Sequence, residues 1–194
     1  MTDREKLWSG VSNAAWGYFF LNFNINLGTL NILPAFVGWF LFRAAIEKLS
    51  GERRELKLLL PLCGLLALWN LADWGLTIFG SGLSGRFLIA DLLVCVAGLY
   101  FHFQFLTDLS ALADTYQKEG GDLDYRLQRR RTAYVVLSTA ADLLICLPLE
   151  RMWEGWTWLT YGAGLLCLIE AVIIMFNLFE LRKCFDAETW DREE

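Results

Sequence analysis

Long apolar blocks, which charged residues barely interrupt, constrain this chain more than any other feature. A helix that crosses a bilayer needs roughly 20 mostly apolar residues. Four blocks meet this requirement: Leu58 to Phe79, Phe87 to Leu106, Ala133 to Leu149 and Trp156 to Leu181. Residues from the set AVILMFWYC make up 56% of the 194 residues, and charged residues make up only 20%. Because this balance is too apolar for an ordinary soluble domain, the sequence predicts an integral membrane protein.

The same composition argues against several other classes of protein. The net charge is −5 and no basic domain is present, which argues against a nucleic-acid binder. The five cysteines include no C-x-x-C pair and mostly fall inside apolar blocks. We therefore expect them to be reduced, and we expect no disulfide scaffold and no metal site. Since the chain has neither a phosphate-binding glycine loop nor a His-Glu zinc motif, we predict no cofactor and no enzymatic activity.

The N-terminal apolar block, Trp8 to Leu49, is too long for one span and contains its own break. Residue types that interrupt helices gather within it at Asn22, Asn24, Asn26, Gly28, Asn31 and Pro34. We interpret the block as a helix over Trp8 to Phe23, a polar turn, and a helix over Pro34 to Leu49. The first helix would be roughly 24 Å long, slightly short for a hydrocarbon core of ~30 Å.

Two all-α architectures of a polytopic membrane helical bundle remain open. One has six transmembrane helices in three in-out-in hairpins, and the other has four full spans after an N-terminal re-entrant hairpin. All 17 basic residues except Arg86 and Arg151 fall in the termini or in the two long loops, which both architectures place on one side. Because Lys and Arg concentrate on the cytoplasmic side, we expect both termini to be cytoplasmic in a cell membrane. We favour six spans, in a single membrane domain over 1–194.

The polar segment 107–131 is expected to form a cytoplasmic helical hairpin. Leu106, Leu109, Leu112 and Tyr116 recur at helical spacing, so the fourth span should continue past the membrane. Gly120 and Gly121 would end that helix, and Asp122 suits the N-cap of the next one. The segment is either a simple projection from the membrane or a docking site for a partner.

Ionisable side chains inside the spans are the candidate functional residues, because each costs at least a few kcal/mol in a bilayer. Asp73, Asp91 and Asp142 lie roughly 8–10 Å below the predicted outer boundary, and the polar turn approaches the same level. The sequence therefore predicts an outer-facing polar pocket, lined by Asn22, Asn24, Asn26, Asn31, Asp73, Asp91 and Asp142. The alternative is that these groups hold the helices together, with Arg86 and Arg151 neutralising Asp91 and Asp142.

Glu170 and His102, the one histidine of the chain, lie deeper in the predicted spans. Counting 1.5 Å per residue places them ~21 Å and ~24 Å below the outer boundary. A contact between them would form a buried titratable pair of the kind found in proton relays. The alternative is that His102 is a packing residue with its hydrogen bonds satisfied.

A short repeat surrounds two of the acids. Ala90-Asp91-Leu92-Leu93-Val94-Cys95 matches Ala141-Asp142-Leu143-Leu144-Ile145-Cys146. Internal repeats mark the substrate sites of many transporters, although six residues rich in common apolar types are weak support for a duplication.

The stretch Asn26-Leu27-Gly28-Thr29-Leu30-Asn31-Ile32-Leu33-Pro34-Ala35-Phe36-Val37-Gly38 resembles one near the N-terminus of small, uncharacterised bacterial multi-pass membrane proteins. The resemblance implies a bacterial plasma-membrane protein and brings no activity with it. In size and number of predicted spans, the chain is also similar to the substrate-binding subunits of energy-coupling-factor vitamin transporters, but it lacks their small-residue helix motif. Gly82-Leu83-Ser84-Gly85 matches the Gly-x-Ser-Gly of rhomboid proteases. The only histidine lies ~27 Å further along the same predicted helix, which rules out a catalytic dyad.

Two hypotheses about function follow. The leading one is a multi-pass membrane protein that binds, or helps to translocate, a small solute or cation through the outer-facing polar pocket. The alternative is a non-catalytic accessory or assembly subunit of a membrane complex, which contacts a partner membrane subunit through its cytoplasmic hairpin. Both expect the lipid bilayer as the main surrounding of the chain.

Overall fold

The computed structural model describes residues 3–23, 26–27, 30–31, 34–80, 82–83, 87–146 and 155–186. Six α-helices dominate this part of the chain, with one 3-10 helix and two very short strands. In chain order they are α1 (Asp3–Asn22), β1 (Asn26–Leu27), β2 (Leu30–Asn31), α2 (Ala35–Leu49), η1 (Arg54–Leu59), α3 (Leu60–Ile78), α4 (Leu88–Tyr116), α5 (Leu123–Cys146) and α6 (Trp156–Lys183). The prediction of an all-helical bundle is therefore confirmed.

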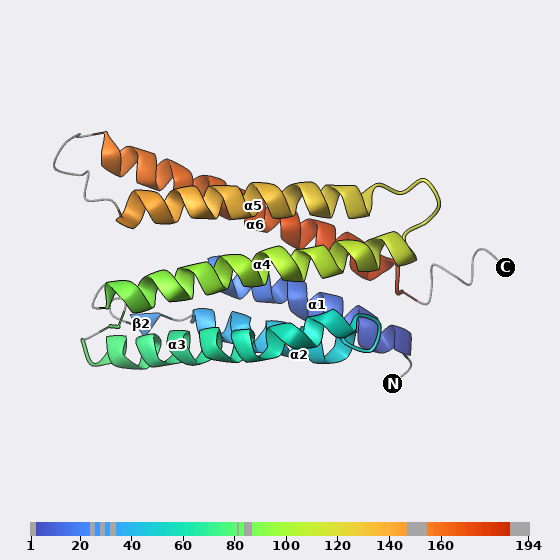
Figure 1. Cartoon of the computed structure of the whole chain (residues 1–194), viewed down its shortest axis with the longest axis horizontal. Helices are drawn as coiled ribbons and strands as arrows, with labels where there is room; N and C mark the ends of the chain where they lie inside the picture. Colours follow the sequence, from blue (N-terminus) through green and yellow to red (C-terminus); the bar gives the residue numbers. More distant parts are fainter. Residues whose placement is uncertain are drawn as a thin grey trace.

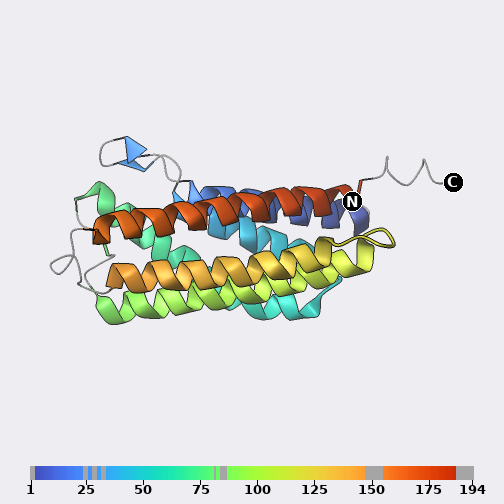
Figure 2. The same cartoon turned by 90° about the horizontal axis from the view of Figure 1, so that it is seen from above.

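Successive helices run in opposite directions along one common axis (Figure 1). The helix α1 packs against α2 and α6, α5 packs against α4 and α6, and α3 packs mainly against α2. Figure 2 shows the same long bundle from above. We call the end where α1 begins and where α2, α4 and α6 finish the basic end, and the opposite end the far end.

The polar turn expected between the first two helices contains a miniature hairpin. Strands β1 and β2 pair antiparallel, with Asn26 opposite Asn31 and Leu27 opposite Leu30. The helix α2 then begins at Ala35, directly after Pro34, whose extended backbone stands outside the helix. The predicted break in the N-terminal block is thus confirmed, and it lies at the far end.

The turn between α4 and α5 follows the sequence prediction closely. Gly120 adopts a positive φ of 81°, which glycine tolerates without steric cost. The Gln117 side chain then links the two helices: its Oε1 accepts a hydrogen bond from the Leu123 N–H at 2.9 Å, and its Nε2 donates to Asp124 at 2.8 Å. These bonds satisfy groups that the start of α5 leaves without an intrahelical partner.

The segment 107–131 is helical as predicted, but it does not stand apart from the bundle. It comprises the last part of α4, a six-residue turn and the first part of α5. Its apolar side chains at Leu109, Leu112, Leu123 and Leu127 are all buried in the main core. Helical spacing correctly indicated an apolar face, and that face packs against the neighbouring helices instead of projecting into solvent.

The prediction of six spans is not supported. Among the described residues, three helical segments are long and apolar enough to cross a membrane: Arg54–Ile78, Ile89–Tyr116 and Trp156–Lys183. The other helices fall short for simple reasons. The first turn of α1 is charged, α2 has only 15 residues, and α5 carries four arginines between its fourth and ninth residues. Three apolar helices indicate a membrane protein, and most residues of their apolar windows are not buried within the bundle.

The packed core lies toward the basic end. Nearer the far ends of α1 and α2, the two helices approach so closely that a side-chain carbon at Gly38 would lie 2.9 Å from the Gly17 carbonyl oxygen. Phe42 packs against Tyr18, Phe101 and Phe105, with ring centroids between 5.1 and 5.4 Å apart. We call this well-packed part of the molecule the basic half.

Candidate functional site

A polar residue occupies every fourth position along α5. We call this set the α5 stripe, and it consists of Arg126, Arg130, Tyr134, Ser138 and Asp142. Residues four apart lie on one face of a helix, so the stripe follows a single, slowly turning face. Each element packed against α5 supplies partners to it, as the contacts below show.

Two ion pairs form the part of the stripe nearest the basic end. Arg126 pairs with Glu180 on α6 through two hydrogen bonds of 2.6 and 2.9 Å, and Arg130 donates to Glu170 on the same helix at 3.0 Å. Hydrogen bonding to Glu180 raises the pKa of the Arg126 guanidinium. Both arginines are therefore neutralised by carboxylates, and the pairs fix the register of α5 against α6.

A buried polar cluster lies in the middle of the stripe. The Tyr134 hydroxyl donates to Asn22 Oδ1 at 3.4 Å, which links α5 to the last residue of α1. His102 Nδ1 and the Tyr18 hydroxyl share a hydrogen bond of 3.2 Å, and the His102 and Tyr134 rings lie 5.3 Å apart. These four residues come from α1, α4 and α5. We call Tyr18, Asn22, His102 and Tyr134 the His102 cluster.

One donor beside this cluster has no partner. The Trp39 ring lies 5.7 Å from the His102 ring, and its buried Nε1–H finds no acceptor among the described residues. Buried donors without an acceptor are rare because desolvation costs on the order of 1–3 kcal/mol. The site therefore has an unused hydrogen-bond donor directed from α2.

At the far end of the stripe, Asp142 contacts α4. Its Oδ2 accepts a hydrogen bond from the Cys95 thiol at 2.8 Å. This contact joins the two copies of the six-residue repeat, because Cys95 belongs to one copy and Asp142 to the other.

The three acids predicted to line the pocket lie on three different helices. Asp73 Oδ1 accepts the backbone N–H of Leu83 at 2.6 Å, so it holds the loop that follows α3. Asp91 lies in the first turn of α4, and Asp142 contacts Cys95. All three stand toward the far end as expected, on the different helices α3, α4 and α5.

The asparagines predicted to line the pocket also belong to different elements. Asn22 belongs to the His102 cluster, and Asn26 and Asn31 are paired positions of the small hairpin. Asn24 lies outside the described residues. The convergence of all seven residues on one pocket therefore stays a prediction.

The proposed contact between Glu170 and His102 is not formed. Glu170 accepts two hydrogen bonds from Arg130, whereas His102 bonds to Tyr18. The sequence-based depth count treated each helix separately and placed Arg130 in a loop region. The register between α5 and α6 instead brings Arg130 to the level of Glu170.

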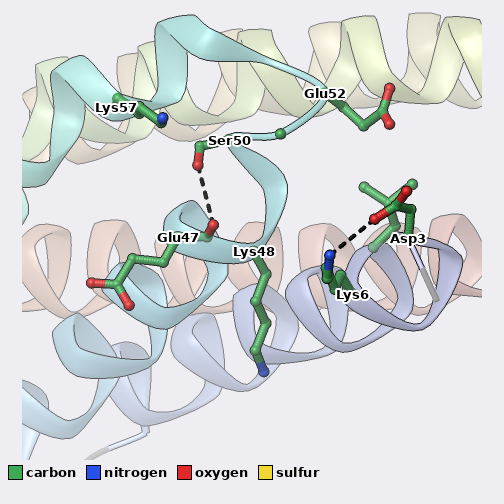
Figure 3. Close-up of a pocket in the computed structure, with 9 residues that line it drawn as sticks. Asp3, Lys6, Glu47, Lys48, Ser50, Glu52 and Lys57 are labelled. Atoms are coloured by element: carbon green, nitrogen blue, oxygen red, sulfur yellow. Dashed lines mark hydrogen bonds and ion pairs between the residues drawn. The ribbon is translucent and has the colours of Figure 1, made fainter. Parts of the chain in front are cut away.

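A hollow of about 450 Å³ lies at the basic end, between α1 and the link from α2 to η1 (Figure 3). Three lysines and three carboxylates line it, together with Ser50. Lys6 pairs with Asp3 at 2.9 Å, and the Ser50 hydroxyl donates to the Glu47 carbonyl at 3.1 Å. Since its charges are balanced, this hollow does not favour a ligand of either sign.

Metal binding and disulfide formation find no support in the part of the chain that the structure describes. No group of three or more His, Cys, Asp or Glu side chains there could hold a metal ion. Cys63, Cys95, Cys167 and Cys184 form no disulfide with one another.

Sequence reasoning missed Tyr18, Tyr134, Trp39 and Arg130 as site residues. Tyrosine and tryptophan are common in apolar helices, and Arg130 was counted among the basic residues of a long loop. The signal that could have revealed part of the set is the four-residue spacing of polar residues from Arg126 to Asp142.

Comparison of the chain with protein-family models, with curated proteins and with solved structures finds no match.

Proposed function

We propose that this chain is a membrane protein that binds a small cation or polar solute, or helps to translocate it, along the α5 stripe. The observation that carries the proposal is the line of polar side chains inside the bundle, from Asp142 to the His102 cluster. Polar groups are costly among apolar helices, and in membranes they typically mark pathways for ions and substrates.

The chemistry of the stripe favours a cation. A cation that entered from the far end would meet the Asp142 carboxylate first, one turn before α5 ends. The hydroxyls of Ser138 and Tyr134 and the amide oxygen of Asn22 follow on successive turns. Oxygen atoms of this kind are the ligands that hard cations prefer. The free Trp39 Nε1–H suits a water molecule that accompanies the ion.

We further propose that the basic end faces the cytoplasm of a bacterial cell membrane. Both described ends of the chain and the α4–α5 turn lie at this end (Figure 1), together with most of the lysines and arginines. The positive-inside rule supports this orientation, and the resemblance of residues 26–38 to bacterial multi-pass proteins supports the compartment.

Ion flux into proteoliposomes tests the proposal. The purified protein is reconstituted, and uptake of radiolabelled Na⁺ and K⁺ and the acidification of an entrapped pH dye are followed after a gradient is imposed. Asp142→Asn should lower the flux of the transported ion about tenfold, which corresponds to ~1.4 kcal/mol. Tyr134→Phe should act in the same direction. Thr139→Val is the matched control, because the Thr139 hydroxyl bonds only to the Val135 carbonyl of its own helix.

Two outcomes would contradict this function. If Na⁺, K⁺ and protons all cross no faster than in empty liposomes, the protein does not translocate these ions. If the Asp142→Asn variant and the wild type give equal flux, the α5 stripe has no role in translocation. Co-purification of a partner subunit that is lost when residues 117–122 are replaced would instead favour the accessory-subunit hypothesis.

A further inference from the structure

Among the described residues, most exposed large apolar side chains of α3 to α6 lie in one part of the length of the bundle. On α4 they are Ile89, Leu92, Leu93, Val96, Tyr100 and Phe103. Beyond Phe103 the apolar residues of the same helix are buried instead: Phe105, Leu106, Leu109, Leu112 and Ala113. The helix therefore changes its surroundings near Thr107.

The same change occurs on α6 at Glu170. Before it, the exposed apolar residues are Trp158, Leu159, Tyr161, Leu165, Leu166 and Ile169. After it, Ala171, Ile174, Leu178 and Leu181 are buried, and Phe176 is the single large apolar side chain that stays exposed. Glu170 is paired with Arg130 of α5, which stands next to Arg131, and Arg131 bonds to Thr107 of α4. The changes on α4 and α6 thus lie at one level.

Helices α3 and α5 complete the pattern. Exposed apolar residues of α3 continue to its far end, and its buried ones lie near its start: Cys63, Leu66 and Ala67. On α5, Val136 and Leu143 are exposed toward the far end, whereas Leu123 and Leu127 are buried. Tyr125 is the exposed exception near the basic end. We call the exposed apolar surface of α3 to α6 on the far side of Thr107 the apolar band.

We infer that the bilayer surrounds the apolar band alone, and that the part of the bundle between the level of Thr107 and the basic end stands outside the hydrocarbon region as a folded, water-exposed unit. The band extends along α4 from Leu88 to about Thr107, some 20 residues or roughly 30 Å at 1.5 Å per residue. This length equals the thickness of a typical hydrocarbon core. The inference does not depend on which solute or ion the α5 stripe binds.

The band runs over four helices, which favours lipid over a protein partner. A partner protein or a second copy of the chain covers one patch of a surface, whereas a bilayer covers the whole circumference. Helices α3, α4, α5 and α6 all contribute to the band, and they lie on different sides of the bundle (Figures 1 and 2).

Basic side chains form a rim where the band ends. The Arg131 guanidinium carbon lies 4.3 Å from the centre of the Phe103 ring, and the same group donates a hydrogen bond to the Thr107 hydroxyl at the edge of the band. On the opposite side, Arg53 donates to the Ala111 carbonyl, one turn beyond Thr107, which brings Arg54 and Lys57 of η1 to the same level. A rim of this charge is complementary to the phosphates of anionic lipid headgroups.

The arrangement gives α1 and α2 a different role from that of spanning helices. Their buried residues, from Leu7 to Tyr18 and from Trp39 to Leu49, pack in the basic half. The helix α1 ends at Asn22, within the His102 cluster. Only the far-end parts of this helical pair lie at the level of the band, where Tyr18 and Trp39 pack against His102. The Arg130–Glu170 pair lies at the boundary rather than in the middle of the membrane.

Two pairs of matched positions test the inference by spin-label accessibility. Leu93 and Tyr125 are both 66% exposed, and Leu165 and Phe176 of α6 are 58% and 62% exposed. Each is replaced by cysteine in a variant without native cysteines, labelled with a nitroxide, and placed in phosphatidylcholine–phosphatidylglycerol vesicles. Collision rates with oxygen, which concentrates in lipid, and with a water-soluble nickel chelate are then compared.

Labels at Leu93 and Leu165 should collide mainly with oxygen, and labels at Tyr125 and Phe176 mainly with nickel. Oxygen-dominated collisions at all four positions would overturn the inference, because the bilayer would then cover the basic half as well. Protection of Leu93 and Leu165 from both reagents would overturn it in favour of a protein partner or a second copy. Retained thermal unfolding of each labelled variant shows that the fold is intact.

Discussion

The same helices bury apolar side chains in the basic half of the bundle and expose them in the apolar band. In the basic half, Phe42, Phe101 and Phe105 are fully buried and their rings contact one another. In the apolar band, side chains of similar character such as Leu93 and Leu165 point away from the bundle. One helix can therefore supply both a protein core and a lipid-facing surface, because burial depends on which helices pack against each of its faces at each level.

The comparison also separates two uses of polar groups. In the basic half, charged residues pair at the surface, as Arg126 does with Glu180. At the level of the band and its edge, the polar groups Asp142, Tyr134 and His102 point inward and bond across helices. The second arrangement is the one that requires explanation in apolar surroundings.

The largest expected difference between the halves concerns aromatic truncation. Phe42→Ala should cost about 3–5 kcal/mol of stability, because it removes a fully buried ring from the core of the basic half. Leu93→Ala, at a position that is 66% exposed, should change stability far less in the same detergent. Thermal unfolding followed by circular dichroism measures both. Equal losses would show that the band is as tightly packed as the core.

Glycine substitutions should show a smaller contrast of the same kind. Gly38→Ala should cost about 1–3 kcal/mol, because the new carbon meets the Gly17 carbonyl and forces α1 and α2 apart. Gly164→Ala on α6 should be neutral or stabilising, since no atom lies within 4 Å of its added carbon and alanine favours helices. The melting temperatures of the two variants measure this contrast. A Gly38→Ala variant more stable than the wild type would refute the close approach of α1 and α2.

The smallest expected difference in stability concerns the two Arg–Glu pairs between α5 and α6. Glu170→Gln should cost about 1–3 kcal/mol, because the pair lies at the edge of the band and both side chains are largely shielded. Glu180→Gln should cost less than about 1 kcal/mol, since that pair is solvent-exposed, and salt should weaken the effect. Unfolding at low and high ionic strength measures both. Equal, salt-sensitive losses would place both pairs in water.

Hydropathy predicted much of the fold because helices in apolar surroundings need long apolar sequences. The expected blocks Phe87 to Leu106 and Trp156 to Leu181 correspond to α4 and α6, and the break near Asn22 corresponds to the end of α1. The number of spans was overestimated because α1, α2 and part of α5 are apolar for packing in the core of the basic half. A hydropathy pattern does not distinguish a lipid-facing residue from a core residue.

The candidate site was less predictable for a related reason. Asp142 was identified from its cost in an apolar helix and Asn22 from its place in the polar turn, and both have partners on other helices. Their partners depend on helix register, which no single-helix pattern contains. The same limit produced the expected Glu170–His102 contact in place of the Arg130–Glu170 pair.

A depth scan along α4 tests the central claim most directly. Single cysteines at the exposed positions Leu92, Val96, Tyr100, Phe103 and Asp114 carry a fluorescent bimane label, in vesicles with brominated acyl chains. If the bilayer surrounds only the apolar band, brominated lipid should quench the label at the first four positions and leave the label at Asp114 unquenched. Equal quenching at Asp114, or none at Leu92 and Val96, would contradict the half-inserted bundle.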